Sequence, residues 1–248
     1  MKQNIQTLVL CGDGINSESE LAHAFSLAGA SAQIMHINQL LKNPQRLLDF
    51  QIFALPGGFS FGDELGSGRI LALKLKQGLG QYLQEFVAQK RPIIGICNGF
   101  QALIHLGLLP QPHFKMQAGL LFNRAGHFQN RWAWLEVHAA GKSPWFLLFE
   151  ENKKIILPIR HGEGRLVLTD KARQDVSAAL VYTQDVNGAD MNIAALTSAG
   201  GTILGMMPHP EAFLYQALSP FCQKGQELKA GDGALIFKSI VKYIQQQT

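Results

Sequence analysis

Cysteine is scarce in this chain, with only three residues among 248, and they lie far apart at Cys11, Cys97 and Cys222. A sparse, odd number argues against a disulfide-stabilised secreted scaffold and is typical of a reducing cytosol. Long hydrophobic runs are also lacking, because no stretch approaches the roughly 18 apolar residues of a membrane span. The first residues, MKQNIQTLVLCGDG, lack the long apolar region and cleavage site of a signal peptide. We therefore expect a cytoplasmic protein without a membrane partner.

A marked excess of one charge is lacking as well. The 22 basic and 18 acidic residues give a formal charge of +4, and the basic ones are not clustered. Nucleic-acid binding needs a basic patch or stripe, so we expect no nucleic-acid partner. Repeats, low-complexity tracts and flexible linkers are not visible either. With 47% hydrophobic residues, the chain has ample material for a core, and a single domain over residues 1–248 is the simplest interpretation.

What the sequence does contain is an alternation of apolar runs and helical patterns. The pattern predicts strands at 5–12, 32–38, 50–58 and 91–97, and helices at 17–30, 65–89 and 98–107. Ser17 and Glu20 form a possible capping box at the start of the first helix. Segments between 112 and 170, such as WAWLEV, alternate like antiparallel strands. We therefore predict an α/β fold with an open, mostly parallel or mixed sheet, flanked by helices, with an antiparallel insertion in the middle.

The stretch GICNGFQ, residues 95–101, places a cysteine between a predicted strand and a predicted helix. Its G-x-C-x-G layout matches that of a nucleophile elbow, in which glycines make room for a tight turn. Cys97 would then lie at the carboxyl end of a strand, where open α/β sheets place their sites, and beside a helix N-terminus, which stabilises negative charge. Cysteine is also among the residue types most often buried. Taken alone, the stretch leaves open whether Cys97 is a nucleophile or a packing residue.

The stretch MMPHPE, residues 206–211, supplies a histidine bracketed by two prolines. Because both prolines favour extended backbone, we expect His209 and Glu211 to lie on the same side of the chain. A carboxylate beside an imidazole holds it in one tautomer, as a catalytic base requires. With Cys97, these residues form a candidate Cys–His–Glu triad for acyl transfer. The alternative is that His209 only caps a turn.

Backbone amides can complete such a site, because a tetrahedral intermediate needs donors aimed at its oxygen. The amide of Asn98, directly after the cysteine, is one candidate. The amide of Gly58 is the other, in a Pro-Gly-Gly stretch that ends the third predicted strand. The alternative for this stretch is a plain turn. It is not a phosphate-binding loop, because the G-x-x-x-x-G-K-[ST] pattern is absent.

Five stretches together carry a resemblance to a known family: LPGGFSFGDELGSGRILA (55–72), GICNGFQALIHLGLLP (95–110), FQNRWAWLEV (128–137), LPIRHGEGRLV (157–167) and MMPHPEAF (206–213). The chain resembles the glutaminase subunits of phosphoribosylformylglycinamidine synthase, which are class I glutamine amidotransferases of de novo purine synthesis. The resemblance runs from about residue 5 to 244 and implies the flavodoxin-like fold of that class. PGGFSFGD, CNGFQ and HGEGR are its most specific motifs.

The resemblance implies a reaction and roles for the triad. Cys97 would attack the side-chain amide of L-glutamine to form a thioester, which water cleaves to glutamate. His209 would transfer the proton to the leaving ammonia, and Glu211 would orient His209.

The resemblance also implies the surroundings of the triad. The amides of Gly58 and Asn98 would hold the oxyanion, Gln101 would contact glutamine, and His161 and Gly162 would line the glutamine pocket or its mouth. No metal site is implied.

The family passes its ammonia to a large synthetase subunit, which converts formylglycinamide ribonucleotide to the amidine. ATP and Mg²⁺ are expected on that partner, and no cofactor is expected in this chain. In many bacteria and archaea a small third protein bridges the two subunits.

Two other interpretations are weighed against this one. A stand-alone cysteine peptidase or γ-glutamyl hydrolase would use the same triad, but PGGFSFGD and the absence of a signal peptide weigh against it. A non-catalytic relative would be expected to have lost Cys97, His209 or Glu211. The chain departs from the family at Ala212, where arginine is usual, and at Ser17, near which many relatives have a cysteine.

Overall fold

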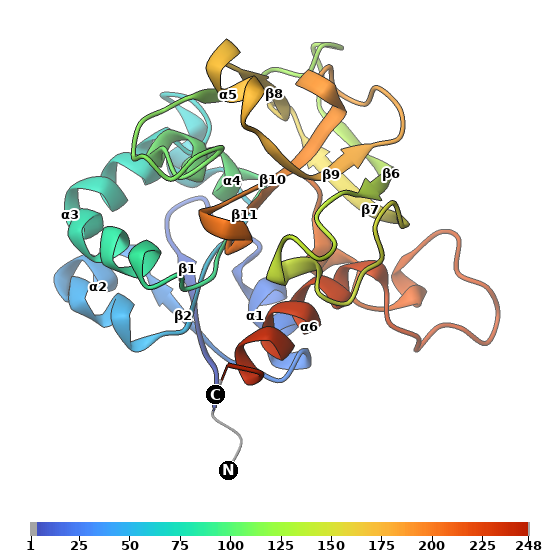
Figure 1. Cartoon of the computed structure of the whole chain (residues 1–248), viewed down its shortest axis with the longest axis horizontal. Helices are drawn as coiled ribbons and strands as arrows, with labels where there is room; N and C mark the ends of the chain where they lie inside the picture. Colours follow the sequence, from blue (N-terminus) through green and yellow to red (C-terminus); the bar gives the residue numbers. More distant parts are fainter. Residues whose placement is uncertain (1–3, 248) are drawn as a thin grey trace.

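The computed structural model describes residues 4–247, so the outermost residues of the predicted 1–248 domain, 1–3 and 248, lie outside the described residues. Strands and helices alternate along the first part of the chain (Figure 1): β1 (Gln6–Cys11), α1 (Glu18–Leu27), β2 (Ser31–His36), α2 (Ile37–Lys42), β3 (Ile52–Leu55), α3 (Arg69–Ala88), β4 (Ile93–Ile96) and α4 (Asn98–Leu106). The remaining elements are mostly strands: β5 (Ala118–Leu121), β6 (Gln129–Val137), β7 (Lys154–His161), β8 (Arg165–Leu168), α5 (Asp170–Gln174), β9 (Ser177–Tyr182), β10 (Ile193–Ser198), β11 (Ile203–Met206) and α6 (Asp232–Gln245).

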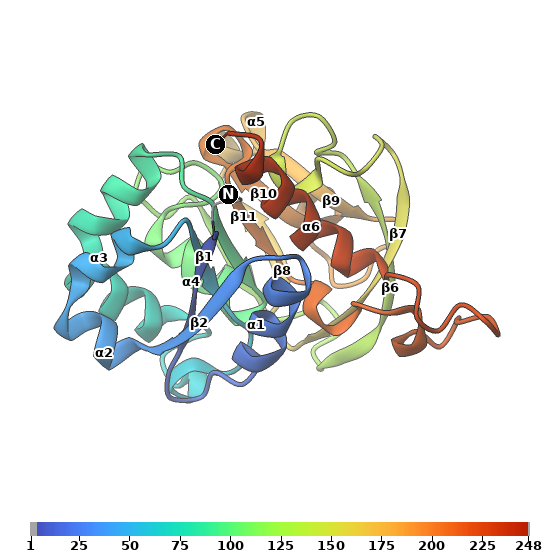
Figure 2. The same cartoon turned by 90° about the horizontal axis from the view of Figure 1, so that it is seen from below.

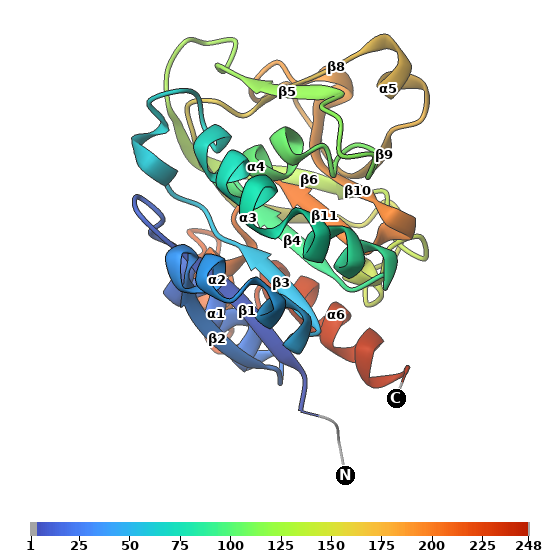
Figure 3. The same cartoon turned by 90° about the vertical axis from the view of Figure 1, so that its left-hand side faces the viewer.

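Within residues 4–247, nine strands form one sheet in the order β2-β1-β3-β4-β11-β10-β9-β6-β7. The pairs from β2 to β11 are parallel, and those from β11 to β7 are antiparallel. Figure 3 shows α3 and α4 over one face of the parallel half and α1 and α6 over the other. All residues of β3, β4 and β11 are buried, as expected for strands covered on both faces. The predicted mixed α/β sheet is confirmed.

The antiparallel strands in the middle of the chain belong to two different sheets. β6 and β7 extend the edge of the main sheet, because β6 pairs with β9. β5 and β8 instead form a separate two-stranded sheet, in which Leu121 lies opposite Arg165. The sequence patterns predict antiparallel strands in this region, but they do not show which segments continue the main sheet.

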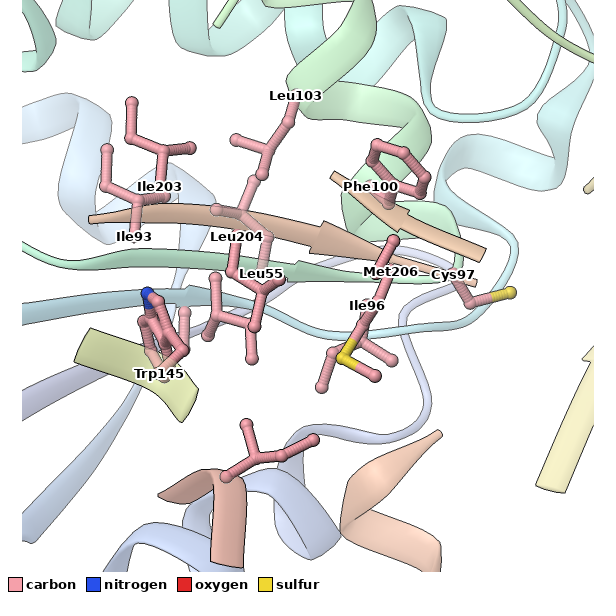
Figure 4. Packing of buried hydrophobic residues seen from close by; sticks show 14 of the residues in the cluster. Leu55, Ile93, Ile96, Cys97, Phe100, Leu103, Trp145, Ile203, Leu204 and Met206 are labelled. Atoms are coloured by element: carbon pink, nitrogen blue, oxygen red, sulfur yellow. The ribbon is translucent and has the colours of Figure 1, made fainter. Parts of the chain in front are cut away.

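The core joins the sheet to its helices through large apolar side chains. Phe25 of α1 and Phe237 of α6 meet edge to face at 5.1 Å, which joins the two helices on one face of the sheet. Figure 4 shows the packing around β4 and β11, with Ile96 and Met206 among the buried side chains. Cys97 lies at the end of β4, and its sulfur is directed away from this packed cluster (Figure 4).

Two details differ from the sequence-based expectations. Ser17 precedes α1, but its side chain makes no capping hydrogen bond, so the predicted capping box is wrong; its hydroxyl lies 3.4 Å from Oδ1 of Asn16 instead. The third strand ends at Leu55 rather than at residue 58, because Pro56 begins the turn that follows.

Residues 216–230 project from the body of the molecule (Figures 1 and 2). Among residues 4–247, no helix is both long and apolar enough to cross a membrane.

Candidate active site

Cys97 occupies a tight turn between β4 and α4. Its backbone has φ 51° and ψ −106°, a conformation that residues with a side chain rarely adopt. The turn needs the flanking glycines: a Cβ on Gly99 would lie 2.0 Å from the carbonyl oxygen of Leu55, and one on Gly95 would lie 2.6 Å from that of Gly99. The thiol is 7% exposed and donates to the carbonyl oxygen of Arg160 at 3.6 Å. Strained backbone of this kind is typical of functional sites.

His209 follows β11 and pairs with Glu211, with 2.6 Å between Nδ1 and Oε1. Residues 210–212 form a 3₁₀ turn, so the predicted extended backbone is wrong; proline suits the first position of a helical turn as well as an extended chain. Burial alone would lower the pKa of His209, but the carboxylate of Glu211 and the neighbouring Cys97 outweigh burial and raise the pKa to about 10. The ring is 5% exposed, and its Nε2 has no hydrogen-bond partner among the described residues.

Cys97 and His209 meet in one pocket of about 360 Å³, a size suited to a small ligand. Gly57 lies against both side chains. A Cβ on Gly57 would lie 2.9 Å from Cε1 of His209 and 3.5 Å from Cβ of Cys97. The two side chains therefore lie beside the same backbone atom, and Glu211, which is 4% exposed, lies behind His209 and away from the pocket lining.

Asn98 ties the start of α4 to the loop over the pocket. Its Oδ1 accepts from the amide of Ser60 at 3.2 Å, and its Nδ2 donates to Asp63 at 2.9 Å and to Oε1 of Gln101 at 3.1 Å. Asp63 also accepts from the hydroxyl of Ser67. The loop is thereby fixed by buried hydrogen bonds to the helix that carries the cysteine.

Two backbone amides near the thiol are available as donors. Gly58 lines the pocket at φ +142°, and a Cβ there would lie 2.6 Å from the carbonyl oxygen of Gly14, so only glycine fits. Asn98 is the first residue of α4, where amides lack helical acceptors. Within residues 4–247, neither amide has a recorded acceptor.

The end of β7 and the loop after it form another wall of the pocket, which His161, Gly162 and Glu163 line. Gln101 also lines it and donates from Nε2 to the carbonyl oxygen of Glu163 at 2.7 Å. His161 is 2% exposed, and burial, reinforced by the positive charges of His209 and Arg131, lowers its pKa to about 4. His161 is therefore neutral at physiological pH.

Comparison with known proteins places the chain in a family. Residues 4–244 match the CobB/CobQ-like glutamine amidotransferase domain. Phosphoribosylformylglycinamidine synthase subunit PurQ of Dehalococcoides mccartyi is 36% identical over 254 residues, which cover 98% of each chain. The chain belongs to the PurQ family of glutamine amidotransferases. The PurQ of Methanococcus maripaludis is 35% identical over 97% of this chain and 94% of its own.

A solved structure agrees with PurQ membership, and a more distant one agrees in fold. A chain in the structure of PurLQS from Thermotoga maritima superposes with a TM-score of 0.79 at 32% identity, covering 98% of this chain and 100% of that one. A glutamine amidotransferase from Thermotoga maritima has a TM-score of 0.61 at 14% identity, covering 98% and 99% of the two chains, and it shows the fold alone. The predicted resemblance to the family is confirmed.

The structure brings most of the sequence-predicted site residues together. The pocket is lined by the predicted residues Gly58, Cys97, Gln101, His161, Gly162 and His209. Asn98 and Glu211 lie directly behind this lining, in contact with it through hydrogen bonds. Their roles in a PurQ reaction stay predictions at this point. Within the described part of the chain, no cluster of three or more His, Cys, Asp or Glu residues is placed to hold a metal ion.

Sequence reasoning gave no role of their own to several residues that shape this PurQ pocket, among them Gly57, Asp63 and Asn123. The first two lie within the PGGFSFGD motif, so the motif gave a signal but not a role for each residue. Asn123 gave no signal, because its importance comes from a buried position beside the loop after β7.

Proposed function

We propose that this chain is the glutaminase subunit of a phosphoribosylformylglycinamidine synthase and hydrolyses L-glutamine to glutamate and ammonia. One observation carries the proposal. A cysteine on a strained strand-to-helix turn shares a pocket with a histidine whose Nδ1 lies 2.6 Å from a buried carboxylate. Membership in the PurQ family supports glutamine as the substrate.

The first half of the proposed reaction forms a thioester. The proton of Cys97 passes to Nε2 of His209 before the attack, since the raised pKa of His209 favours the imidazolium, and Sγ of Cys97 then attacks the side-chain amide carbon of glutamine. The amides of Gly58 and Asn98 donate to the oxygen that becomes negative. The tetrahedral intermediate collapses, its C–N bond breaks, and His209 returns the proton to the departing nitrogen, which leaves as ammonia. Glu211 stabilises the imidazolium that forms on the way.

The second half repeats these steps with water. His209 removes a proton from the water as it attacks the thioester carbon, and then returns the proton to the sulfur as the C–S bond breaks. Glutamate is released and the thiol is restored. Gln101, His161 and Gly162 contact the glutamine in this scheme, since all three line the pocket beside Cys97.

We propose that the protein works in the cytoplasm and passes the ammonia to a synthetase partner. That partner binds ATP and Mg²⁺ and converts formylglycinamide ribonucleotide to formylglycinamidine ribonucleotide, with a small third subunit bridging the two. The likeness to a chain of the Thermotoga maritima PurLQS structure supports an assembly of this kind.

The decisive experiment separates glutamine use from ammonia use in the reconstituted complex. Cys97→Ala is expected to abolish glutamine-dependent synthesis and to leave synthesis with added ammonium intact. Cys222→Ala, in the projecting segment, is the matched control and should leave both activities unchanged. Glutamine-dependent synthesis that persists in Cys97→Ala contradicts the proposal.

A further inference from the structure

Asn123 is a buried residue to which neither the sequence motifs nor the triad assigns a role. It follows β5 and is 2% exposed. Because β5 pairs antiparallel with β8, it lies opposite the loop that precedes β8. Its backbone amide donates to the carbonyl oxygen of Gly162 at 2.8 Å. Its side chain makes four more contacts, with the carbonyl oxygens of His127 and His161, Nδ1 of His161 and the amide of Gly164.

These partners fix the orientation of the Asn123 amide. Nδ2 carries two hydrogens and faces two carbonyl oxygens, of His161 at 2.8 Å and of His127 at 3.0 Å. Oδ1 faces the amide hydrogen of Gly164 at 3.2 Å. The flipped amide would set oxygen against oxygen and N–H against N–H, so it is excluded.

The same orientation fixes the proton on His161. Nδ1 of His161 lies 3.0 Å from Oδ1 of Asn123, which can only accept. Nδ1 must therefore carry the hydrogen, and the neutral ring is left with a bare lone pair at Nε2. That atom is buried and has no partner within residues 4–247, although His161 lines the pocket that holds Cys97. An unpaired buried acceptor is costly unless a ligand satisfies it.

We propose that Asn123 is a positioning residue, which locks His161 in the Nδ1–H tautomer so that bare Nε2 accepts an N–H group of the bound substrate. The identity of that substrate as glutamine rests on the proposed function. The lock itself rests only on the hydrogen bonds around Asn123.

Asn187 provides a matched control for loop support. It is also 2% exposed, and its Nδ2 donates to the carbonyl oxygen of Gly164 at 2.7 Å. Its Oδ1 accepts from the amide of Ala189, and neither atom bonds His161. Loss of Asn187 therefore loosens the same loop without releasing the His161 ring.

The first test reads the tautomer directly, by ¹⁵N NMR of the full chain with labelled histidine, with His161→Gln used to assign the signal. Wild type should show a protonated, pyrrole-type Nδ1 and a bare, pyridine-type Nε2. Asn123→Ala should move His161 toward the Nε2–H form, whereas Asn187→Ala should not. A protonated Nε2 in the neutral wild-type ring overturns the proposal, even if Asn123→Ala fails to fold.

The second test measures glutamine kinetics in the reconstituted complex. Asn123→Ala should raise KM for glutamine about tenfold, as expected for the loss of one buried hydrogen bond, while Asn187→Ala raises it less. Equal changes in KM for Asn123→Ala and Asn187→Ala would overturn the proposed contact between Nε2 of His161 and the substrate. Absence of glutaminase activity in the wild-type complex, with the Nδ1–H tautomer observed, instead refutes the proposed function and leaves the lock standing.

Discussion

Gly57→Ala is the perturbation that tests the geometry of the proposed active site most finely. The added methyl would lie 2.9 Å from Cε1 of His209 and 3.5 Å from Cβ of Cys97. Ordinary contact between carbon atoms is about 3.5–4.0 Å, so the imidazole must move by roughly 0.5–1 Å. Cys97 can keep its place, because its own distance is already an ordinary contact. The change therefore displaces the proposed base relative to the proposed nucleophile.

The expected loss follows from that displacement. A misplacement of about 1 Å can lower a rate about 100-fold, so kcat for glutamine hydrolysis should fall by roughly 10–100-fold, or about 1.4–2.7 kcal/mol in activation free energy. The free energy of unfolding should fall by no more than about 2 kcal/mol, since overpacking costs about 1–3 kcal/mol and the Gly→Ala exchange restricts the unfolded chain.

The assay is ammonia release from glutamine by the reconstituted complex, with synthesis from added ammonium measured in parallel. Gly80→Ala makes the same exchange within α3, where no atom lies within 4 Å of the new Cβ, and it should leave kcat unchanged. A Gly57→Ala enzyme with wild-type kcat would refute the reasoning, because His209 would then tolerate displacement.

Three further predictions address neighbouring residues. Glu211→Gln removes the carboxylate that raises the pKa of His209, so the pKa of His209 should fall. The kcat for glutamine hydrolysis should drop by about 10³–10⁴-fold, as in other triads. A pH–rate profile checks both effects, and a loss of kcat below tenfold would contradict the prediction. His161 has a pKa of about 4 in the fold against 6.5 when free, so the unfolded chain binds its proton first as pH falls. The contribution of neutral His161 to the free energy of unfolding is therefore complete above pH 6.5, and about 3 kcal/mol of it is lost as the pH falls toward 4. In urea unfolding, the free energy of unfolding of His161→Gln should depend less steeply on pH than that of wild type. An unchanged pH dependence would be inconsistent with this. Asp63→Ala leaves the buried Nδ2 of Asn98 without one acceptor and should lower the free energy of unfolding by about 2 kcal/mol in urea; a change under about 0.5 kcal/mol would count against the loop anchor.

Much of the fold could be predicted from the sequence because its signals are local. The buried strands β3 and β4 and the LVLC stretch of β1 are continuous apolar runs. Helix α4 ends at Gly107, which has the left-handed backbone typical of a helix end. The joining of β6 and β7 to the main sheet could not be predicted, since it depends on pairing with β9, more than 40 residues away. Local patterns also misled at Ser17, whose residue type suits a cap that its side chain does not make.

The candidate site, like the fold, could be predicted only in part from the sequence. Cys97, His209 and Glu211 could be selected from short motifs, but their closeness depends on β4 and β11 being neighbours in the sheet. The expected extended geometry at His209 was wrong even though the contact with Glu211 was right, because a 3₁₀ turn also brings the two side chains together. Residues whose role is to hold others lacked any local pattern. Asn123 is the example, since its side-chain partners lie at the end of β7 and in two loops, whose positions relative to Asn123 the sequence does not give.

The central claim is that Cys97 carries the glutamyl group during turnover. Its most direct test is mass spectrometry of peptides from the complex, quenched in acid while it turns over glutamine. The account predicts a γ-glutamyl thioester on the peptide that contains Cys97, and none on the peptides of Cys11 or Cys222. A trapped glutamyl group on another residue, or turnover with no adduct on Cys97 when thioester cleavage limits the rate, would contradict it.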